Sequence, residues 1–329
     1  MIVLGGVDEA GLGPLLGPLC VAGAAFAFED EASLAADPFE PFDLWAALGG
    51  AVSREPADDR HALVVGDSKV VHARNPRGER RLEATVLAFA AHLLAGRVPD
   101  SLAALSLDAT SESVWRSRHP WLADGDPPLP HACSSEFLEL RSALLARALA
   151  AARCAPAALA VRRVEPGELN REFERSGNKA HAAWHFASAA LLHVVARARE
   201  LGAREVRLAV DRQGGRAHYG PLLARLFQEW RVFLVEESDG VSRYRLEGEP
   251  RIFVTFEERA EARHFAVALA SCLAKYTREV SMAALNAWFG ARAPGLAPTA
   301  GYTTDGRRWL ADAAKLVSTI ERDLLVRQR

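Results

Sequence analysis

The sequence predicts an α/β protein with a mixed sheet flanked by helices. Short apolar runs alternate with longer segments of helical periodicity, and no repeat or low-complexity linker interrupts the alternation. The 329 residues allow one large domain or two modest ones. Hydrophobic residues make up 50% and charged residues 25%, which is the balance of a globular protein and excludes a disordered or collagen-like chain.

Two strands are expected at the start of the chain. Residues 1–7 read MIVLGGV and residues 19–28 read LCVAGAAFAF, with a Gly- and Pro-rich segment between them. Those breakers predict two buried strands joined by a loop rather than one helix. The first run is followed directly by Asp8 and Glu9, so we expect two carboxylates at the carboxyl end of the first strand.

The next stretch mixes loops, helices and one strand. Residues 29–59 are rich in Ala, Pro and acidic side chains, which predicts irregular structure with short helices. Helical periodicity covers 80–94 and 137–152, and the apolar run 158–164 predicts a strand. Residues 111–133 are dense in Pro, Asp and Trp, and we expect a surface insertion there.

Helices and strands alternate through the second half of the chain. The strand at 205–211 again ends on a carboxylate, Asp211. In chain order we expect a helix over 179–201, that strand, a short helix over 219–228, strands over 231–235 and 251–256, a long helix over 260–285 and an amphipathic helix over 309–326.

Charge and cysteine usage restrict the class of protein. Forty basic and forty-two acidic residues leave a net charge of −2, so any contact with nucleic acid must come from a local patch. The uncharged stretch 10–28 contains Gly and Pro and follows two acidic residues, which argues against a signal peptide or a membrane span. The four cysteines, which show neither the spacing of a zinc site nor that of a disulfide framework, are Cys20, Cys133, Cys154 and Cys272. This usage favours a cytoplasmic location.

Carboxylates at strand ends are the first chemical signal. Open α/β sheets bind ligands at the carboxyl ends of their strands, where Asp8, Glu9 and Asp211 are expected. Clustered carboxylates repel one another unless a cation neutralises them, and their hard oxygens suit Mg²⁺ or Mn²⁺. Two such ions can activate water for phosphodiester cleavage. The alternative is that these are ordinary polar residues in turns.

Five motifs give the chain a family resemblance. Taken in order they resemble motifs of ribonuclease HII, a type 2 ribonuclease H: VDEAGLGPLLGP at 7–18, GDSK at 66–69, LAVDRQGG at 208–215, ASCLAKYTRE at 270–279 and GYTT at 301–304. The resemblance implies a ribonuclease-H-like mixed β-sheet flanked by helices. It also implies a catalytic domain over 1–285, with insertions near 29–59, 111–133 and 222–248, and a C-terminal helical extension over 286–329.

The resemblance implies a set of four metal-holding catalytic carboxylates. Three are Asp8, Glu9 and Asp211, and the fourth lies ten residues before Ser271, at Glu261. Ribonuclease HII has Asp at that position, whereas its sister group, ribonuclease HIII, has Glu. We favour Glu261 because we expect it to open a helix, where the helix dipole stabilises a carboxylate. The rivals for this position are Glu257, Glu258, Glu236 and Glu237.

The same motifs imply substrate-binding residues. One departure is that Leu12 stands where the family has Arg, so this side chain can make no charge-assisted contact with a phosphate. The implied set is Gly11, Leu12, Gly13, Lys69, Ser271, Lys275 and Tyr302.

The implied activity is metal-dependent endonucleolytic hydrolysis, with Mg²⁺ or Mn²⁺, of the RNA strand of RNA–DNA hybrids or of duplex DNA that contains ribonucleotides. The products would carry 5′-phosphate and 3′-hydroxyl ends. Leu12 and the near-neutral charge motivate an alternative, a non-catalytic nucleic-acid-binding relative that kept the fold. A dinucleotide-binding enzyme is disfavoured, because the Gly spacing after the first strand departs from G-x-G-x-x-G and a strand follows it. The sequence indicates no membrane association and identifies no protein partner.

Overall fold

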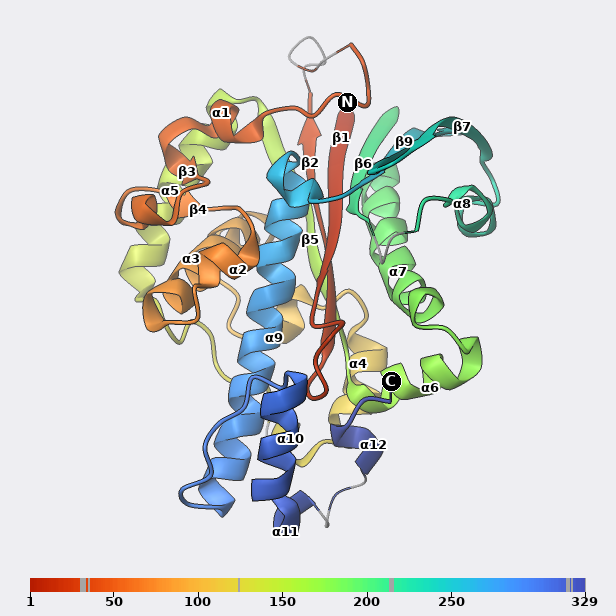
Figure 1. Ribbon diagram of the computed structural model, residues 1–329. Helices are drawn as coiled ribbons and strands as arrows, with labels where there is room; N and C mark the ends of the chain where they lie inside the picture. Colours follow the sequence, from red (N-terminus) through yellow and green to blue (C-terminus); the bar gives the residue numbers. More distant parts are fainter. Residues whose placement is uncertain are drawn as a thin grey trace.

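The predicted mixed α/β sheet flanked by helices is confirmed by the structure, a computed structural model (Figure 1). It describes residues 1–29, 34, 36–123, 125–212, 216–317, 320 and 322–328. Within these residues the main sheet has seven strands in the order β5-β2-β1-β6-β9-β8-β7. They are β1 (Ile2–Ala10), β2 (Leu19–Phe28), β5 (Cys154–Val164), β6 (Glu205–Asp211), β7 (Arg231–Ser238), β8 (Val241–Glu247) and β9 (Arg251–Glu257).

The parallel centre of the sheet brings the predicted carboxylates to one edge. β6 runs parallel to both β1 and β9, whereas the outer pairs of strands are antiparallel. Val7 of β1 lies beside Val210 of β6, so Asp8 and Asp211 follow at the same level. β1 continues through Asp8 and Glu9 to Ala10, so the two carboxylates belong to the last residues of the strand rather than to the loop after it.

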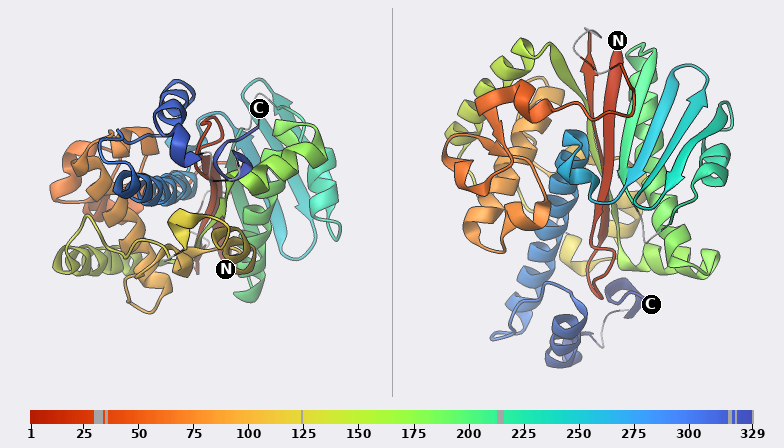
Figure 2. Two further views of the ribbon diagram at one scale, coloured as in Figure 1. Left: turned by 90° about the horizontal axis from the view of Figure 1, so that it is seen from below. Right: turned by 45° about the horizontal axis from the view of Figure 1, so that its top comes forward.

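Helices cover both faces of the sheet (Figure 2). One face packs against α7 (Lys179–Glu200) and α8 (Gly220–Leu226), and the other against α3 (Pro76–Leu93) and α9 (Phe265–Arg292), with α5 (Ser135–Ala151) outside α3. The smaller elements are α1 (Leu44–Leu48), β3 (Val52–Ser53), β4 (Leu63–Val64), α2 (Ser68–His72), α4 (Ala109–Arg116), α6 (Pro166–Ser176), α10 (Thr303–Asp312), α11 (Ala314–Val317) and α12 (Arg322–Leu325). Among the described residues, no helix combines the length and apolarity needed to cross a bilayer.

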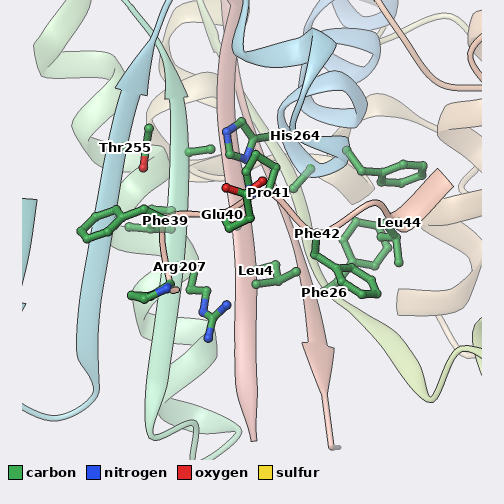
Figure 3. A pocket seen from close by; sticks show the side chains of 16 residues that line it. Leu4, Phe26, Phe39, Glu40, Pro41, Phe42, Leu44, Arg207, Thr255 and His264 are labelled. Atoms are coloured by element: carbon green, nitrogen blue, oxygen red, sulfur yellow. The ribbon is translucent and has the colours of Figure 1, made fainter. Parts of the chain in front are cut away.

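The segment 36–42 lies across the sheet and covers a small apolar cavity (Figure 3). Phe39 packs edge-to-face on Phe253, and Phe42 packs in the same way on Phe28. The cavity holds only about 40 Å³, which is room for a water molecule and not for a substrate. Within 29–59, where we expect irregular structure with short helices, residues 36–42 form this cover and Leu44–Leu48 form a short helix. Residues 30–33 and 35 lie outside the described part.

Three expectations were wrong. Residues 111–133 do not lie wholly on the surface, because Trp121 and Leu122 pack into a buried cluster with the end of α9 and the C-terminal helices. The single helix expected over 309–326 is broken into α10, α11 and α12; residues 318, 319 and 321 lie outside the description. The sequence pattern does not predict strand β8, because its alternation of polar and apolar residues is short and lies inside the insertion expected near 222–248.

Gly6 fixes how closely α9 approaches the sheet. A Cβ on this residue would overlap the backbone of Ala266 and Val267 in the first turn of α9. No side chain can therefore stand at this position without pushing the helix away. The close approach brings Ser271, one and a half turns further along α9, beside the end of β1.

We expect Gly6→Ala to lower the free energy of unfolding by about 3 kcal/mol, because the methyl group would meet backbone that cannot move aside. Urea unfolding measures this change. The matched control is Gly50→Ala, where an added Cβ meets no atom within 4 Å and the change should be small. Equal unfolding midpoints for the two variants would contradict this account of the helix–sheet contact.

Candidate functional site

A cavity of about 330 Å³ lies where the carboxyl ends of β1 and β6 meet α2 and α9. It brings together segments that are more than 250 residues apart in the chain, and it is lined by every residue of the implied catalytic and substrate-binding sets. The lining comprises Asp8, Glu9, Ala10, Gly11, Leu12, Gly13, Pro14, Asp67, Ser68, Lys69, Asp211, Glu261, Ser271, Lys275, Arg278 and Tyr302.

Asp8 is held at the end of β1 by two hydrogen bonds. Its Oδ1 accepts from the N–H of Glu9 at 2.7 Å, and its carboxyl group is hydrogen-bonded to Ser271. Ser271 is buried, and its Oγ lies within hydrogen-bonding distance of Oγ of Ser68, at 3.0 Å. Burial raises the pKa of Asp8 well above its usual range, and the nearby charges of Glu9 and Asp211 raise it further. The Asp8 side chain thus lies in an acidic cluster that its surroundings do not neutralise.

Asp211 and Glu261 are joined through one turn of the backbone. Oδ1 of Asp211 accepts from the N–H of Ala260 at 3.1 Å, which fixes the 3₁₀ turn Ala260–Ala262 against the end of β6. Arg259 opens this turn with a left-handed backbone, at φ +56°. Burial raises the pKa of both carboxyl groups, and the charge of Asp211 raises the pKa of Glu261 further.

Glu261 does not open α9 as expected. It lies in the 3₁₀ turn, and α9 begins only at Phe265. The argument from the dipole of that helix is therefore wrong, because the position of Glu261 depends on the hydrogen bond from Ala260 to Asp211 instead.

The rival carboxylates do not line the cavity. Glu257 is buried in ion pairs with Arg263 at 2.9 Å and His264 at 2.8 Å. Glu236 on strand β7 pairs with Arg243 on β8, and Glu237, also on β7, is bound to His218 and Tyr244. Glu258 is exposed beyond the end of β9.

Two lysines reach the cavity in different states. Lys69 lies on α2 and is exposed, and in the described part of the chain it makes no ion pair closer than 4 Å. Its charge acts against the rise in the pKa of Asp211 and Glu261. Lys275 is ion-paired with Glu279, one turn further along α9, so part of its charge is neutralised.

Buried arginines hold the glycine-rich loop between β1 and β2. Nη1 of Arg278 donates to the carbonyl of Pro18 at 2.8 Å, and Nε of Arg327 donates to the carbonyl of Gly17 at 2.9 Å. Gly11 has φ +89°, and a Cβ there would lie 2.8 Å from Cδ of Arg278, so only glycine fits. The loop is therefore held in position by the buried guanidinium groups of Arg278 and Arg327, which donate to its carbonyl groups.

The other members of the implied substrate set surround this loop. A Cβ on Gly13 would meet no atom within 4 Å, so this position is open on its solvent side. Leu12 packs its side chain partly against the core. Tyr302 precedes α10 and is 43% exposed, and the carbonyl of Gly301 beside it accepts from the N–H of Leu15 at 2.7 Å. The GYTT motif is thereby docked on the glycine-rich loop.

The site includes residues that were missed. Asp67 caps α2 by accepting from the N–H of Lys69 at 2.9 Å, and it lines the cavity with Ser68. Both stand in the GDSK motif, so a signal was present. Arg327 had no such signal, because a C-terminal arginine matches no local motif. Residues 213–215 of the LAVDRQGG motif lie outside the described part.

A second cavity of about 640 Å³ adjoins the first. The two share Asp67, Lys69, Asp211 and Glu261. Beyond these residues the second cavity is lined by Arg54 and Arg259, among others. Arg54 lies flat on Trp45, 3.6 Å from the ring centroid, and donates to the carbonyl of Ala262 at 2.6 Å. Together the cavities form a groove with acidic side chains at its centre, and one end of it carries Arg54, Arg259 and Glu55.

The donor set fits a hard divalent cation in its chemistry. Burial raises the pKa of Asp8, Asp211 and Glu261, and the charge of Asp211 raises the pKa of the other two further. A cation would favour the charged forms of all three. In the part of the chain that the structure describes, no three His, Cys, Asp or Glu side chains converge closely enough to hold an ion between them. The carboxylates share a cavity without forming a closed coordination shell.

Fold and site together define a mixed α/β protein with an acidic site at the carboxyl ends of parallel strands. The family model described as ribonuclease HII matches residues 224–322. This segment contains Glu261, Ser271, Lys275 and Tyr302, but neither Asp8 nor Asp211. A comparison with curated protein sequences gave no match.

Solved structures resemble the chain over almost its whole length at low identity. A chain of the PCNA–RNase HII complex from Archaeoglobus fulgidus is 17% identical, with 99% of this chain and 94% of that chain covered and a TM-score of 0.42. Ribonuclease H2 from Pyrococcus horikoshii is 14% identical, with 98% and 92% covered and a TM-score of 0.41. Bst-RNase HIII in complex with Mn²⁺ is 15% identical, with 98% and 71% covered and a TM-score of 0.38.

Proposed function

We propose that this protein is a metal-dependent endoribonuclease that hydrolyses the RNA strand of RNA–DNA hybrids and leaves 5′-phosphate and 3′-hydroxyl ends. The observation that carries the proposal is the meeting of Asp8, Glu9, Asp211 and Glu261 in one cavity, from segments far apart in the chain. The match of residues 224–322 to ribonuclease HII supports it.

The four carboxylates are the proposed ligands of Mg²⁺ or Mn²⁺. When bound, the metal supplies an activated water and positive charge at the scissile phosphate. Ser271 orients the Asp8 carboxyl group, and the N–H of Ala260 orients that of Asp211. These contacts hold the two acidic side chains in place before substrate arrives, which limits the reorganisation needed for catalysis.

Other side chains of the groove suit a nucleic-acid strand. Lys69, which is exposed and lines the cavity, offers a positive charge to a phosphate beside the carboxylates. Tyr302 presents an exposed ring with a hydroxyl group, which suits contact with a sugar whose 2′-OH distinguishes RNA from DNA. The adjoining cavity with Arg54 and Arg259 extends the groove, as a polymer substrate requires.

A second candidate is a nucleic-acid-binding relative without catalytic activity. It is favoured by Leu12 at a loop position that faces the cavity, by the pairing of Lys275 with Glu279, and by the absence of three converging metal ligands among the described residues. Under this alternative the groove would bind a duplex and release it uncut.

A cleavage assay separates the two candidates. End-labelled substrates would be incubated with the wild-type protein and Mn²⁺ or Mg²⁺: an RNA–DNA hybrid, a DNA duplex with one ribonucleotide, an all-DNA duplex and an all-RNA duplex. We expect cuts in the RNA strand of the hybrid and none in the all-DNA duplex. Binding of the hybrid without cleavage in either metal would establish the second candidate instead.

We expect Leu12→Arg to strengthen binding of the hybrid. The new guanidinium would face the cavity and could contact a phosphate, which is worth about 1.5 kcal/mol or roughly tenfold in KM. Each added phosphate contact also steepens the dependence of log affinity on log salt by about 1. The control is Leu140→Arg, on the exposed face of α5. Equal KM values and salt slopes for both variants would refute a phosphate beside position 12.

A further inference from the structure

The middle of strand β7, at one edge of the sheet, is apolar and exposed. β7 is the last strand in the sheet order, and no strand in the described part of the chain pairs with its outer side (Figures 1 and 2). Phe233, Leu234 and Val235, in the middle of β7, are 41%, 60% and 50% exposed. Edge strands of soluble proteins are usually protected by charges, prolines or short length, because exposed edges pair with other strands. Three successive exposed apolar residues on such an edge indicate a binding surface.

The pairing of β7 with β8 shows which residues share a face. On one face, Arg231 lies opposite Glu247 of β8, Phe233 opposite Arg245, and Glu236 opposite Arg243. Arg231, Phe233 and Glu236 therefore form one row. Val232 and Leu234 form the row on the other face, opposite Leu246 and Tyr244. The register shifts between Leu234 and Glu236, which leaves Val235 as the extra residue of a bulge.

We propose that β7 pairs antiparallel with β7 of a second copy of this chain, about a two-fold axis at Phe233. Phe233 then faces Phe233 of the second copy. Val232 faces Leu234 of the second copy on the opposite side of the sheet. Arg231 faces Glu236 of the second copy, and the symmetry forms this ion pair twice. The bulge is what makes Glu236, rather than Val235, the partner of Arg231.

The order of charges along β7 favours a second copy over an unrelated strand. The strand has a positive residue at its start, apolar residues in its middle and two negative residues, Glu236 and Glu237, near its end. Such a sequence is complementary to itself when antiparallel, whereas parallel pairing would place like charges side by side. Arg231 makes no ion pair closer than 4 Å with the described residues, and Glu236 is held on its face by Arg243 at 3.0 Å.

The proposed interface is separate from the candidate site. No residue of β7 lines either cavity of the groove, so dimer formation would leave the groove open. A single pair of strands buries a small area, at the low end for protein interfaces, and we expect a Kd of about 10 μM. The inference therefore does not depend on the proposed activity.

Sedimentation equilibrium tests the pairing. We expect the wild-type protein to approach twice its monomer mass of 35.6 kDa as its concentration rises through the micromolar range. Phe233→Lys should weaken dimerisation at least tenfold, because two lysines would face each other on the axis. Leu140→Lys is the matched control, since Leu140 is also an exposed apolar residue and lies on α5, far along the chain from β7. Circular dichroism would check that each variant is folded.

A charge swap gives the decisive result. Arg231→Glu and Glu236→Arg should each weaken self-association, because each places like charges opposite one another. An equimolar mixture of the two variants should dimerise again, since opposite charges then meet at both ends. A wild-type protein that stays monomeric at about 100 μM, well above the expected Kd, would overturn the proposal. So would a mixture of the folded variants that fails to dimerise.

Discussion

The variant Asp8→Asn should lose cleavage of an RNA–DNA hybrid while remaining folded. Asn keeps the shape of Asp8 and can still accept from the N–H of Glu9, but it removes a negative charge from the proposed metal site. We expect the rate to fall by about 10³-fold or more, equivalent to about 4 kcal/mol of transition-state stabilisation. The measurement is the initial rate of hybrid cleavage with Mn²⁺, at saturating substrate.

Stability should move in the opposite direction to activity. The raised pKa of Asp8 means that folding disfavours its ionised form, so a neutral Asn at this position removes a cost near neutral pH. Urea unfolding should therefore show equal or higher stability for Asp8→Asn. The matched control is Asp239→Asn, in the exposed turn between β7 and β8, which should retain the wild-type rate. Full activity in Asp8→Asn would refute the assignment of the site.

The variant Glu83→Gln should lower the free energy of unfolding by about 3 kcal/mol, because it breaks a buried charged network. Glu83 on α3 is fully buried. Its carboxylate accepts from the N–H groups of Ala132 and Cys133 at 2.7 and 2.6 Å, and from the Tyr276 hydroxyl at 2.8 Å. The His131 ring lies 2.8 Å from the same carboxylate. This network ties α3 to the loop before α5 and to α9, the helix that carries Ser271.

The same network predicts a loss of stability in acid. Burial would raise the pKa of Glu83, but hydrogen bonds from His131 and Tyr276 outweigh it and lower the pKa to about 2. Its contribution, about 3 kcal/mol, is present above pH 4.5, the ordinary Glu value, and is lost as the pH falls toward 2. The pKa of His131 is raised by Glu83, so its contribution is present below pH 6.5 and is lost as the pH rises through the raised value.

Urea unfolding between about pH 2 and pH 7 measures both effects. The wild-type protein should lose stability between pH 4.5 and pH 2 more steeply than Glu83→Gln. Glu79→Gln is the matched control, because Glu79 also binds the His131 ring, at 2.9 Å, but is exposed. It should cost less than about 1 kcal/mol. Equal destabilisation by the two variants would contradict the burial-based argument.

The central sheet and the carboxylates at its edge were predictable because their signals are local. Apolar runs define β1 and β6, and the residues that follow each run, Asp8 and Asp211, reach the same edge because the strands are parallel. The helices α3, α5 and α7 were also predictable, since each repeats apolar residues at helical spacing over at least four turns.

The features that sequence patterns did not predict depend on contacts between distant segments. The Pro- and Asp-rich composition of 111–133 is typical of the surface, yet Trp121 is buried because the end of α9 and α10 pack against it. Arg327 bonds to Gly17 across 310 residues, and no local pattern can report such a contact. The turn that carries Glu261 is likewise set by Asp211, which lies 50 residues earlier.

Binding of Mn²⁺, followed by electron paramagnetic resonance, tests most directly whether the four carboxylates of the candidate site bind a divalent cation together. The wild-type protein should bind Mn²⁺, and Asp211→Asn should weaken that binding at least tenfold, about 1.4 kcal/mol. Asn can still accept from the N–H of Ala260, so the turn stays in place, and Asp239→Asn should bind Mn²⁺ as the wild type does. Equal Mn²⁺ affinity for the wild type and Asp211→Asn, or no binding by either, would contradict the account.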